Sequence, residues 1–227
     1  MFGRGVKAAR ASVLAGLLAV AAAGAPAPAV AAGPTVDAMV VHRDGAVTGP
    51  KRISVGPTRW GRCRLGEGLP IGVLASLRLA FRARGSCGAL YVFEVESQRE
   101  AGLGGWVYKV GRTLPSRAAS DPGVALRSGQ RVIWFWCRRA GACQRTLAMQ
   151  VPRSVRRGER FRVVVRGYDD FGRGRRVRRA VVRYDGRVAR TNRRGVAVLR
   201  ALRPGSLRLV GTRRGMIRSF PSVVSVR

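Results

Sequence analysis

The chain has 227 residues, with 44 Lys and Arg against 11 Asp and Glu, so its formal net charge at pH 7 is +33. A field of this size attracts anionic polymers such as nucleic acid and anionic cell-wall polymer, and also acidic lipid surfaces. One His and four Cys leave little material for His- or Cys-based catalytic centres and metal sites.

The N-terminus has the pattern of a secretory signal. Arg4, Lys7 and Arg10 form a positive region, an apolar run follows at 11–25, and the small residues at 29–31 offer a cleavage site. The run is too short and too rich in Ala for a membrane span, which needs about 20 apolar residues. We therefore expect a secreted protein of about 195 residues, located outside the cell at or near the envelope, with no membrane span after cleavage.

The four cysteines predict two disulfides, because an exported chain matures in an oxidising compartment. Four cysteines allow three connectivities. We favour Cys63 with Cys87 and Cys137 with Cys143, because the second pair brackets a five-residue loop that a hairpin would close. No Cys-x-x-Cys is present, so the sequence predicts structural disulfides and not redox chemistry.

The first predicted elements after the signal are two strands and a helix. Alternation at 36–42 predicts a strand, and 52–55 is its expected partner after an Asp-Gly turn. The stretch 70–84 predicts the one helix of the chain. It carries an apolar stripe at helical spacing that ends with Phe81, and Pro70 suits the first turn.

Two aromatic strands are expected to form the densest part of the first core. The strand at 104–111 carries Trp106 and Tyr108 on one face. The strand at 130–137 is apolar on both faces, so we expect both faces to be covered. The stretch 144–151 is predicted to pair back on it across the second disulfide loop.

From residue 151 onward the pattern is all β. Short apolar alternations are separated by Gly and Asp turns, a spacing typical of a small β-sandwich, and they lie at 161–165, 181–184, 196–199, 207–210 and 223–226. This half holds 23 Arg against four acidic residues, a net charge of +19. The predicted fold is mainly β with one helix: a signal peptide at 1–31, an α+β domain at 32–150 and a small all-β sandwich at 151–227.

Two motifs in the first half carry a family resemblance. The run Gly105-Trp106-Val107-Tyr108-Lys109-Val110-Gly111 and, after an irregular loop, the run Leu126-Arg127-Ser128-Gly129-Gln130-Arg131-Val132-Ile133-Trp134 resemble an uncharacterised bacterial domain related to the C-terminal β domain of transcobalamin and intrinsic factor. The family usually has Asn before the Gly of the first motif and an acidic residue where Gln130 stands. The resemblance implies a β-grasp-like fold over 35–150 and, as a weaker functional alternative, cobalamin or corrinoid binding.

The second half resembles a bacterial immunoglobulin-like or carboxypeptidase-regulatory-like sandwich through its residues 180–185, 191–199 and 202–205. Such modules act as spacers and as adhesion or carbohydrate-contact units in exported proteins. The resemblance therefore implies an Ig-like sandwich.

The first functional hypothesis is a non-enzymatic binding module at the cell envelope, with a small extracellular ligand or an envelope polymer as its partner. Its candidate contacts are aromatic and basic residues beside long loops, namely Trp60, Trp106, Tyr108, Arg112 and Arg117. The sequence predicts no catalytic residue, no metal site and no cofactor. The only His is His42, and no Gly-x-Ser-x-Gly accompanies it.

The second hypothesis is a structural or adhesive protein held electrostatically on anionic cell-wall polymer or extracellular DNA. The predicted contacts are arginines in turns of the second half, which we expect to gather at one end of the sandwich: Arg156, Arg157, Arg173, Arg175, Arg176, Arg178, Arg179, Arg193, Arg194, Arg213 and Arg214. Such polyanion binding is non-specific and weakens steeply with salt. Two origins of the arginines stay open: selection for binding, and drift in a GC-rich genome.

Overall fold

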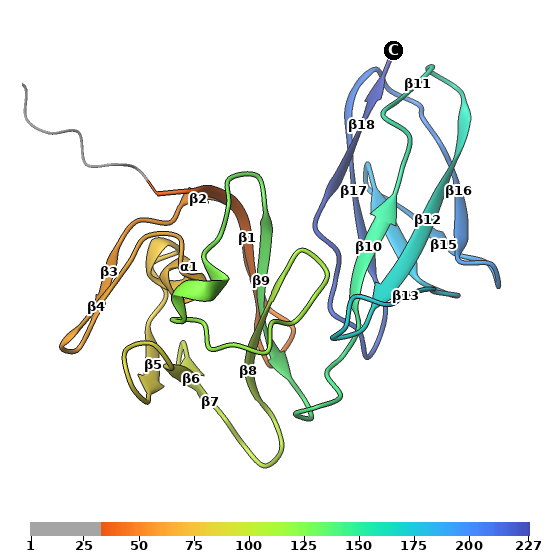
Figure 1. Cartoon of the computed structure of the whole chain (residues 1–227). Coiled ribbons are helices and arrows are strands. Elements are labelled where there is room, and N and C mark those ends of the chain that lie inside the picture. The colour runs from red at the N-terminus through yellow and green to blue at the C-terminus, as the bar shows by residue number, and fades with distance from the viewer. Residues whose placement is uncertain (1–32) are drawn as a thin grey trace, which may run out of the picture. The chain divides into compact units, whose positions relative to one another are not determined.

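The first sheet contains four strands in the order β2-β1-β9-β8 (Figure 1). The computed structural model describes residues 33–227, so the predicted export signal lies outside the described residues. The strands are β1 (Thr35–Val41), β2 (Val47–Ser54), β8 (Gly105–Val110) and β9 (Arg131–Cys137). The central pair β1 and β9 is parallel, and each has an antiparallel outer neighbour. A hairpin followed by a helix and a last strand that returns beside the first is the predicted β-grasp-like arrangement.

Both faces of the central strands are buried, as the sequence predicts for 130–137. On one face, Val40 and Trp134 belong to a core that also contains Trp106. On the other face, Met39 and Phe135 belong to a second cluster. Because side chains alternate along a strand, an uninterrupted apolar run must supply two cores at once.

The helix is shorter than the sequence predicts. It spans α1 (Pro70–Ser76), and the prediction of a helix over 70–84 is wrong beyond Ser76. Arg78 has a left-handed backbone with φ of 58°, and the chain then enters a strand. Phe81 belongs to that strand and stacks on Trp60 with ring centroids 4.8 Å apart. Alternating Phe-Arg-Ala-Arg matches the strand period, which outweighs the helical stripe once a partner strand is present.

The remaining elements of this half are short: β3 (Thr58–Trp60), β4 (Cys63–Leu65), β5 (Phe81–Arg84), β6 (Tyr91–Val95), β7 (Gln98–Arg99) and the 3₁₀ turn Pro122–Val124. β3 pairs with β4, and β5, β6 and β7 form a three-stranded sheet. Within residues 33–227 no helix is long and apolar enough to cross a membrane.

The second half contains two sheets, as predicted for a β-sandwich. One has β10 (Thr146–Gln150), β12 (Arg160–Tyr168), β13 (Gly174–Arg176) and β16 (Val196–Arg200). The other has the order β11 (Ser154–Val155), β18 (Ser222–Val226), β17 (Gly205–Thr212), β14 (Val181–Tyr184) and β15 (Arg187–Arg190). Val163 and Leu199 of the first sheet share a core with Val182 and Leu209 of the second.

The strand β10 belongs to the sandwich and not to the first sheet. It pairs antiparallel with β12, with Thr146 opposite Tyr168, so the expected pairing with 130–137 is wrong. Leu147 is buried in the sandwich core. The described residues belong to one compact unit, and the division into two domains at residue 151 stays a prediction.

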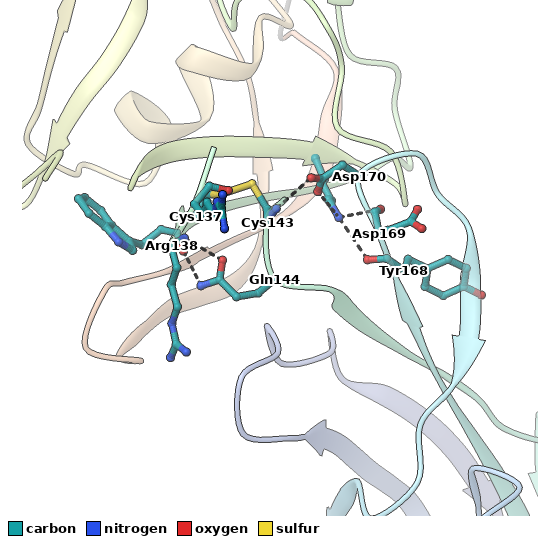
Figure 2. Close-up of a disulfide and its surroundings, with 10 residues drawn as sticks. Cys137, Arg138, Cys143, Gln144, Tyr168, Asp169 and Asp170 are labelled. Carbon is teal, nitrogen blue, oxygen red and sulfur yellow. Dashed lines mark hydrogen bonds and ion pairs between the residues drawn. A yellow bond between two sulfur atoms is a disulfide. The ribbon is translucent and has the colours of Figure 1, made fainter. Parts of the chain in front are cut away.

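Both disulfides have the favoured connectivity. Cys63 is bonded to Cys87, and Cys137 to Cys143, across sequence separations of 24 and 6 residues. Figure 2 shows the second bridge, where the backbone N–H of Cys143 donates to Asp170 Oδ2 at 3.1 Å. The short loop that this bridge closes therefore contacts the chain just after β12.

Candidate functional site

An apolar cleft of about 170 Å³ is lined by β8, β9 and the loop that follows β8. Trp106, Tyr108 and Trp134 line it from the strands, and Leu114 and Arg117 line it from the loop. The loop is tied to the sheet, because the Tyr108 hydroxyl donates to the backbone oxygen of Arg117 at 2.9 Å. This hydrogen bond fixes the wall of the cleft that the loop supplies.

The N–H donors of the two indole rings already have acceptors within the protein. The indole N–H of Trp106 donates to the backbone oxygen of Gln98 at 2.7 Å, and that of Trp134 donates to Pro70 O at 3.0 Å. Only the Arg117 guanidinium adds a charge at the rim, and Asp121 accepts from it at 3.3 Å. The cleft can therefore take an apolar group, with a carboxylate or another acceptor beside Arg117.

The structure brings together three of the five predicted ligand residues. Trp106, Tyr108 and Arg117 meet at the cleft, although Trp106 is only 2% and Tyr108 only 6% exposed. Both rings are primarily core residues, and they reach a ligand only through the surface that lines the cleft. Trp60 is half-buried against Phe81, and the Arg112 guanidinium lies 4.5 Å from the Tyr168 ring centroid. These two residues do not line the cleft.

Tyr108 stays protonated well into the alkaline range. Burial, and to a lesser extent the negative charge of Asp121, raises the pKa of its hydroxyl to about 12. The neutral Tyr108 hydroxyl can therefore donate to Arg117 O at every physiological pH. Its role in the described structure is to position the loop, and the hydroxyl does not supply a proton at neutral pH.

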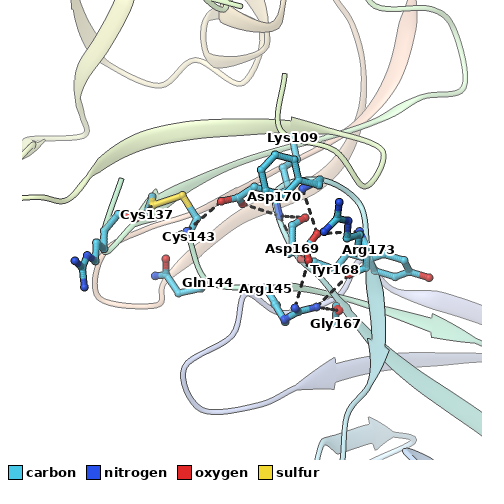
Figure 3. A network of polar contacts seen from close by, with 12 residues as sticks. Lys109, Cys137, Cys143, Gln144, Arg145, Gly167, Tyr168, Asp169, Asp170 and Arg173 are labelled. Atoms are coloured by element: carbon cyan, nitrogen blue, oxygen red, sulfur yellow. Dashed lines mark hydrogen bonds and ion pairs between the residues drawn. A yellow bond between two sulfur atoms is a disulfide. The ribbon is translucent and has the colours of Figure 1, made fainter. Parts of the chain in front are cut away.

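Lys109 is fully buried, which its place in an amphipathic strand did not predict. Its ammonium group donates to the carbonyl oxygens of Tyr168 at 3.2 Å and Asp169 at 2.8 Å (Figure 3). It also lies 3.2 Å from Asp170 Oδ1, an ion pair that lacks hydrogen-bond geometry. Burial lowers the pKa of Lys109, and the neighbouring carboxylates offset this only in part. Lys109 thus joins β8 to the loop after β12.

Asp169 organises the same loop from its other side. Its carboxylate accepts from the backbone N–H groups of Phe171 and Arg173 and lies 3.3 Å from the Arg145 guanidinium (Figure 3). Partial desolvation is the largest single influence and raises its pKa. Two kinds of contact outweigh it and bring the pKa of Asp169 below its usual range: hydrogen bonds from the backbone N–H groups of Arg173 and Phe171, and the positive charges of Arg145 and Arg173. Asp169 and Asp170 are therefore structural carboxylates.

Arg213 is half-buried, and the other ten of the eleven predicted polyanion contacts are exposed: Arg156, Arg157, Arg173, Arg175, Arg176, Arg178, Arg179, Arg193, Arg194 and Arg214. Among residues 151–227, Arg203 alone lies within ion-pair distance of a carboxylate, at 3.9 Å from Asp185. This leaves 22 of the 23 arginines of this half without a carboxylate within ion-pair distance in the described structure. The second half therefore carries a largely uncompensated positive surface.

Nine of these eleven arginines lie at one end of the sandwich, and Arg156 and Arg157 lie at the other. Arg157 precedes the first residue of β12, whereas Arg173 follows its last residue, Tyr168. A nine-residue strand is about 30 Å long, which separates the two groups. Arg176 and Arg194 do come together, because the Arg176 guanidinium donates to Arg194 O at 3.3 Å. Most of the predicted contacts therefore gather where β12 ends, because β13 and the turns before β14, before β16 and after β17 meet there.

Sequence reasoning missed arginines that lie on strands. Arg183 on β14 and Arg190 on β15 are exposed, as the alternation with buried Val182 could have shown. Outward positions of strands carry charge here as well as the turns. Arg218 follows β17 and carried no signal of its own.

The single histidine has a structural environment. His42 Nε2 lies 3.0 Å from Thr48 Oγ1, and its ring meets Trp106 edge-on at 5.9 Å. Residues 33–227 contain no group of three or more His, Cys, Asp or Glu that could hold a metal ion.

No family model matches the chain, and a comparison with the curated proteins finds no significant match.

Proposed function

We propose that this chain is an exported, non-enzymatic protein that attaches to anionic polymer of the cell envelope through its arginine-covered β-sandwich. The observation that carries the proposal is the surface of 22 arginines without a carboxylate within ion-pair distance in the described part of the chain. The two disulfides suit an oxidising compartment outside the cytosol.

Attachment of this kind is driven by counterion release. Each arginine that neutralises a charge on the polymer frees a condensed counterion. The logarithm of the binding constant therefore falls linearly with the logarithm of the salt concentration, with a slope set by the number of contacts. Six to ten contacts correspond to a loss of about 10³- to 10⁵-fold in affinity between 50 and 200 mM salt for duplex DNA. The second half has 20 exposed arginines, at least twice that number, and no pocket is needed.

The test is binding of the mature, oxidised protein to isolated cell envelopes at about 50 and about 300 mM salt, where a fall of at least about 100-fold is expected. The variant Arg175→Gln/Arg176→Gln/Arg178→Gln should weaken binding at low salt. A matched control, Arg59→Gln/Arg62→Gln/Arg64→Gln, removes the same charge from exposed positions of the first half. Binding that changes less than about threefold with salt, or that falls equally in both variants, would overturn the proposal. Stronger retention on DNA than on envelopes would assign the polymer to extracellular DNA.

The apolar cleft supports a second candidate function, the binding of a small apolar ligand. At about 170 Å³ it is smaller than the roughly 300–1,000 Å³ of pockets that enclose drug-sized ligands. It therefore suits one aromatic or branched aliphatic group better than a corrinoid, which is the ligand that the family resemblance implies. Arg117 at the rim favours a ligand that also carries a carboxylate.

Tryptophan fluorescence tests this second candidate directly, because Trp106 and Trp134 line the cleft. Saturable quenching by a small aromatic acid, lost in Ala118→Phe because the larger side chain fills the cleft, would support it. Quenching by cobalamin that survives this substitution would place a corrinoid elsewhere. An unchanged spectrum with every ligand tried would remove the cleft as a binding site.

A further inference from the structure

The outward face of one sandwich sheet places several arginines side by side. Val182 of β14 is buried in the core, so its neighbours Val181 and Arg183 face outward. The register sets Arg190 of β15 and Thr212 of β17 opposite Val181, on the two sides of β14. Because opposed residues of antiparallel strands share a face, Arg183 and Arg190 project from the same surface.

The loop after β17 closes this surface into a groove of about 530 Å³. Six arginines line this arginine groove: Arg179, Arg183, Arg190, Arg213, Arg214 and Arg218. No acidic residue lines it, and the rest of the wall is made by Thr212, Met216 and Val181 with Val41 and Gly45. The loop is held in place in part by the Arg213 guanidinium, which donates to Arg179 O at 3.2 Å.

One of these arginines has an unsatisfied buried donor. The Nε of Arg218 is inaccessible to solvent and has no hydrogen-bond acceptor among the described residues. Partial burial, followed by the positive charges of Arg183 and Arg208, lowers the pKa of Arg218. The like charges gathered in one groove are unfavourable, and a bound anion would relieve their repulsion.

We propose that the arginine groove is a binding site for an oxyanion of the phosphate class, such as a phosphodiester or pyrophosphate group. The planar guanidinium fork pairs with two oxygens of such a group at once, and several forks can surround one tetrahedral anion. The inference deepens the proposed function, because it identifies the repeating group of the envelope polymer that the sandwich would hold. It differs from that function in predicting a defined, saturable site.

The test uses inorganic pyrophosphate as the probe and isothermal titration calorimetry of the mature, oxidised protein at about 150 mM salt, near physiological ionic strength. We expect one saturable site per chain, with affinity at least about tenfold lower in Arg183→Gln/Arg218→Gln, since this variant removes two charge-assisted pairs. The control variant Arg156→Gln/Arg157→Gln removes the same charge from the turn before β12 and should stay within about twofold of the wild type.

Arg218 is partly buried, so a second variant guards against a loss of fold. Arg190 is exposed on the edge strand β15 and forms no ion pair within residues 33–227. Arg190→Gln should therefore keep the wild-type circular dichroism spectrum and still weaken pyrophosphate binding at least about threefold. Weakening by this folded variant supports the site. Unchanged affinity in both groove variants would overturn it.

The outcomes separate this inference from the proposed function. If pyrophosphate shows no saturable binding while envelope binding remains steeply dependent on salt, the groove is refuted and the proposed function survives. If pyrophosphate binds at one site but envelope binding ignores salt, the proposed function fails and the groove stands. Equal loss of pyrophosphate affinity in the control variant would show a diffuse ion atmosphere in place of a site.

Discussion

Removing the partner of the buried lysine should be among the most destabilising single changes in this chain. In Asp170→Asn, Lys109 keeps its two carbonyl acceptors but loses the charge that lies 3.2 Å away. Coulomb's law at that distance, with an effective dielectric constant of about 20, gives an attraction of about 5 kcal/mol. The carboxylate is 16% exposed, so solvent screens part of this, and we expect a loss of about 3 kcal/mol in the free energy of unfolding.

The opposite substitution, Lys109→Met, should also lower the free energy of unfolding by about 3 kcal/mol. Met fills a similar apolar volume near Phe135, but it leaves Asp170 Oδ1, which solvent does not reach, without its counter-charge. The double variant Lys109→Met/Asp170→Asn removes both charges, so it should cost about as much as either single change. The coupling energy between the two positions is then about 3 kcal/mol.

Denaturant unfolding at pH 7, followed by tryptophan fluorescence with the disulfides intact, measures all three variants. The exposed pair Arg131 and Asp37, at 3.8 Å, provides the control cycle, and its coupling should stay below about 1 kcal/mol. A loss below about 1 kcal/mol in Asp170→Asn, or a coupling no larger than that of the exposed pair, would refute the reasoning. It would mean that water reaches Lys109 in solution.

Two further predictions concern Tyr108 and the longer disulfide loop. The pKa of Tyr108 is raised from 10.0 to about 12, so its contribution to stability is complete below pH 10 and is lost as the pH rises through about 12. Tyr108→Phe removes the hydrogen bond to Arg117 O and should lower the free energy of unfolding by about 1 kcal/mol at pH 7. In this variant, the free energy of unfolding should fall less steeply above pH 10 than in the wild type. Parallel curves would contradict the burial of this hydroxyl. Replacing Cys63 and Cys87 by Ala frees a loop of 24-residue separation and should lower the free energy of unfolding by about 3 kcal/mol, against about 2 kcal/mol for the six-residue loop. Denaturant unfolding of the two variants, each with one disulfide replaced by two Ala, measures both losses. Equal losses would show that loop entropy does not set the difference.

Sequence patterns were enough to predict the mainly-β fold, the start of the helix at Pro70, the strands around Trp106 and Trp134, and the favoured disulfide pairs. Each rests on local information: the period of the apolar residues, the fixed φ of proline and the short spacing between Cys137 and Cys143. The exposed arginines of the turns belong to the same group, because turn residues lie at the surface.

Tertiary structure alone decided the rest, because each remaining feature depends on a partner far away in the chain. Phe81 leaves the helix because β6 offers a strand partner and Trp60 a stacking surface. Lys109 is buried because Asp170, 61 positions later, lies beside it. The groove at Arg183, Arg190 and Arg218 forms because the register of β14 with its neighbours sets separate arginines on one face. A sequence pattern shows which residues face outward, but only the pairing of strands determines which charges lie next to one another.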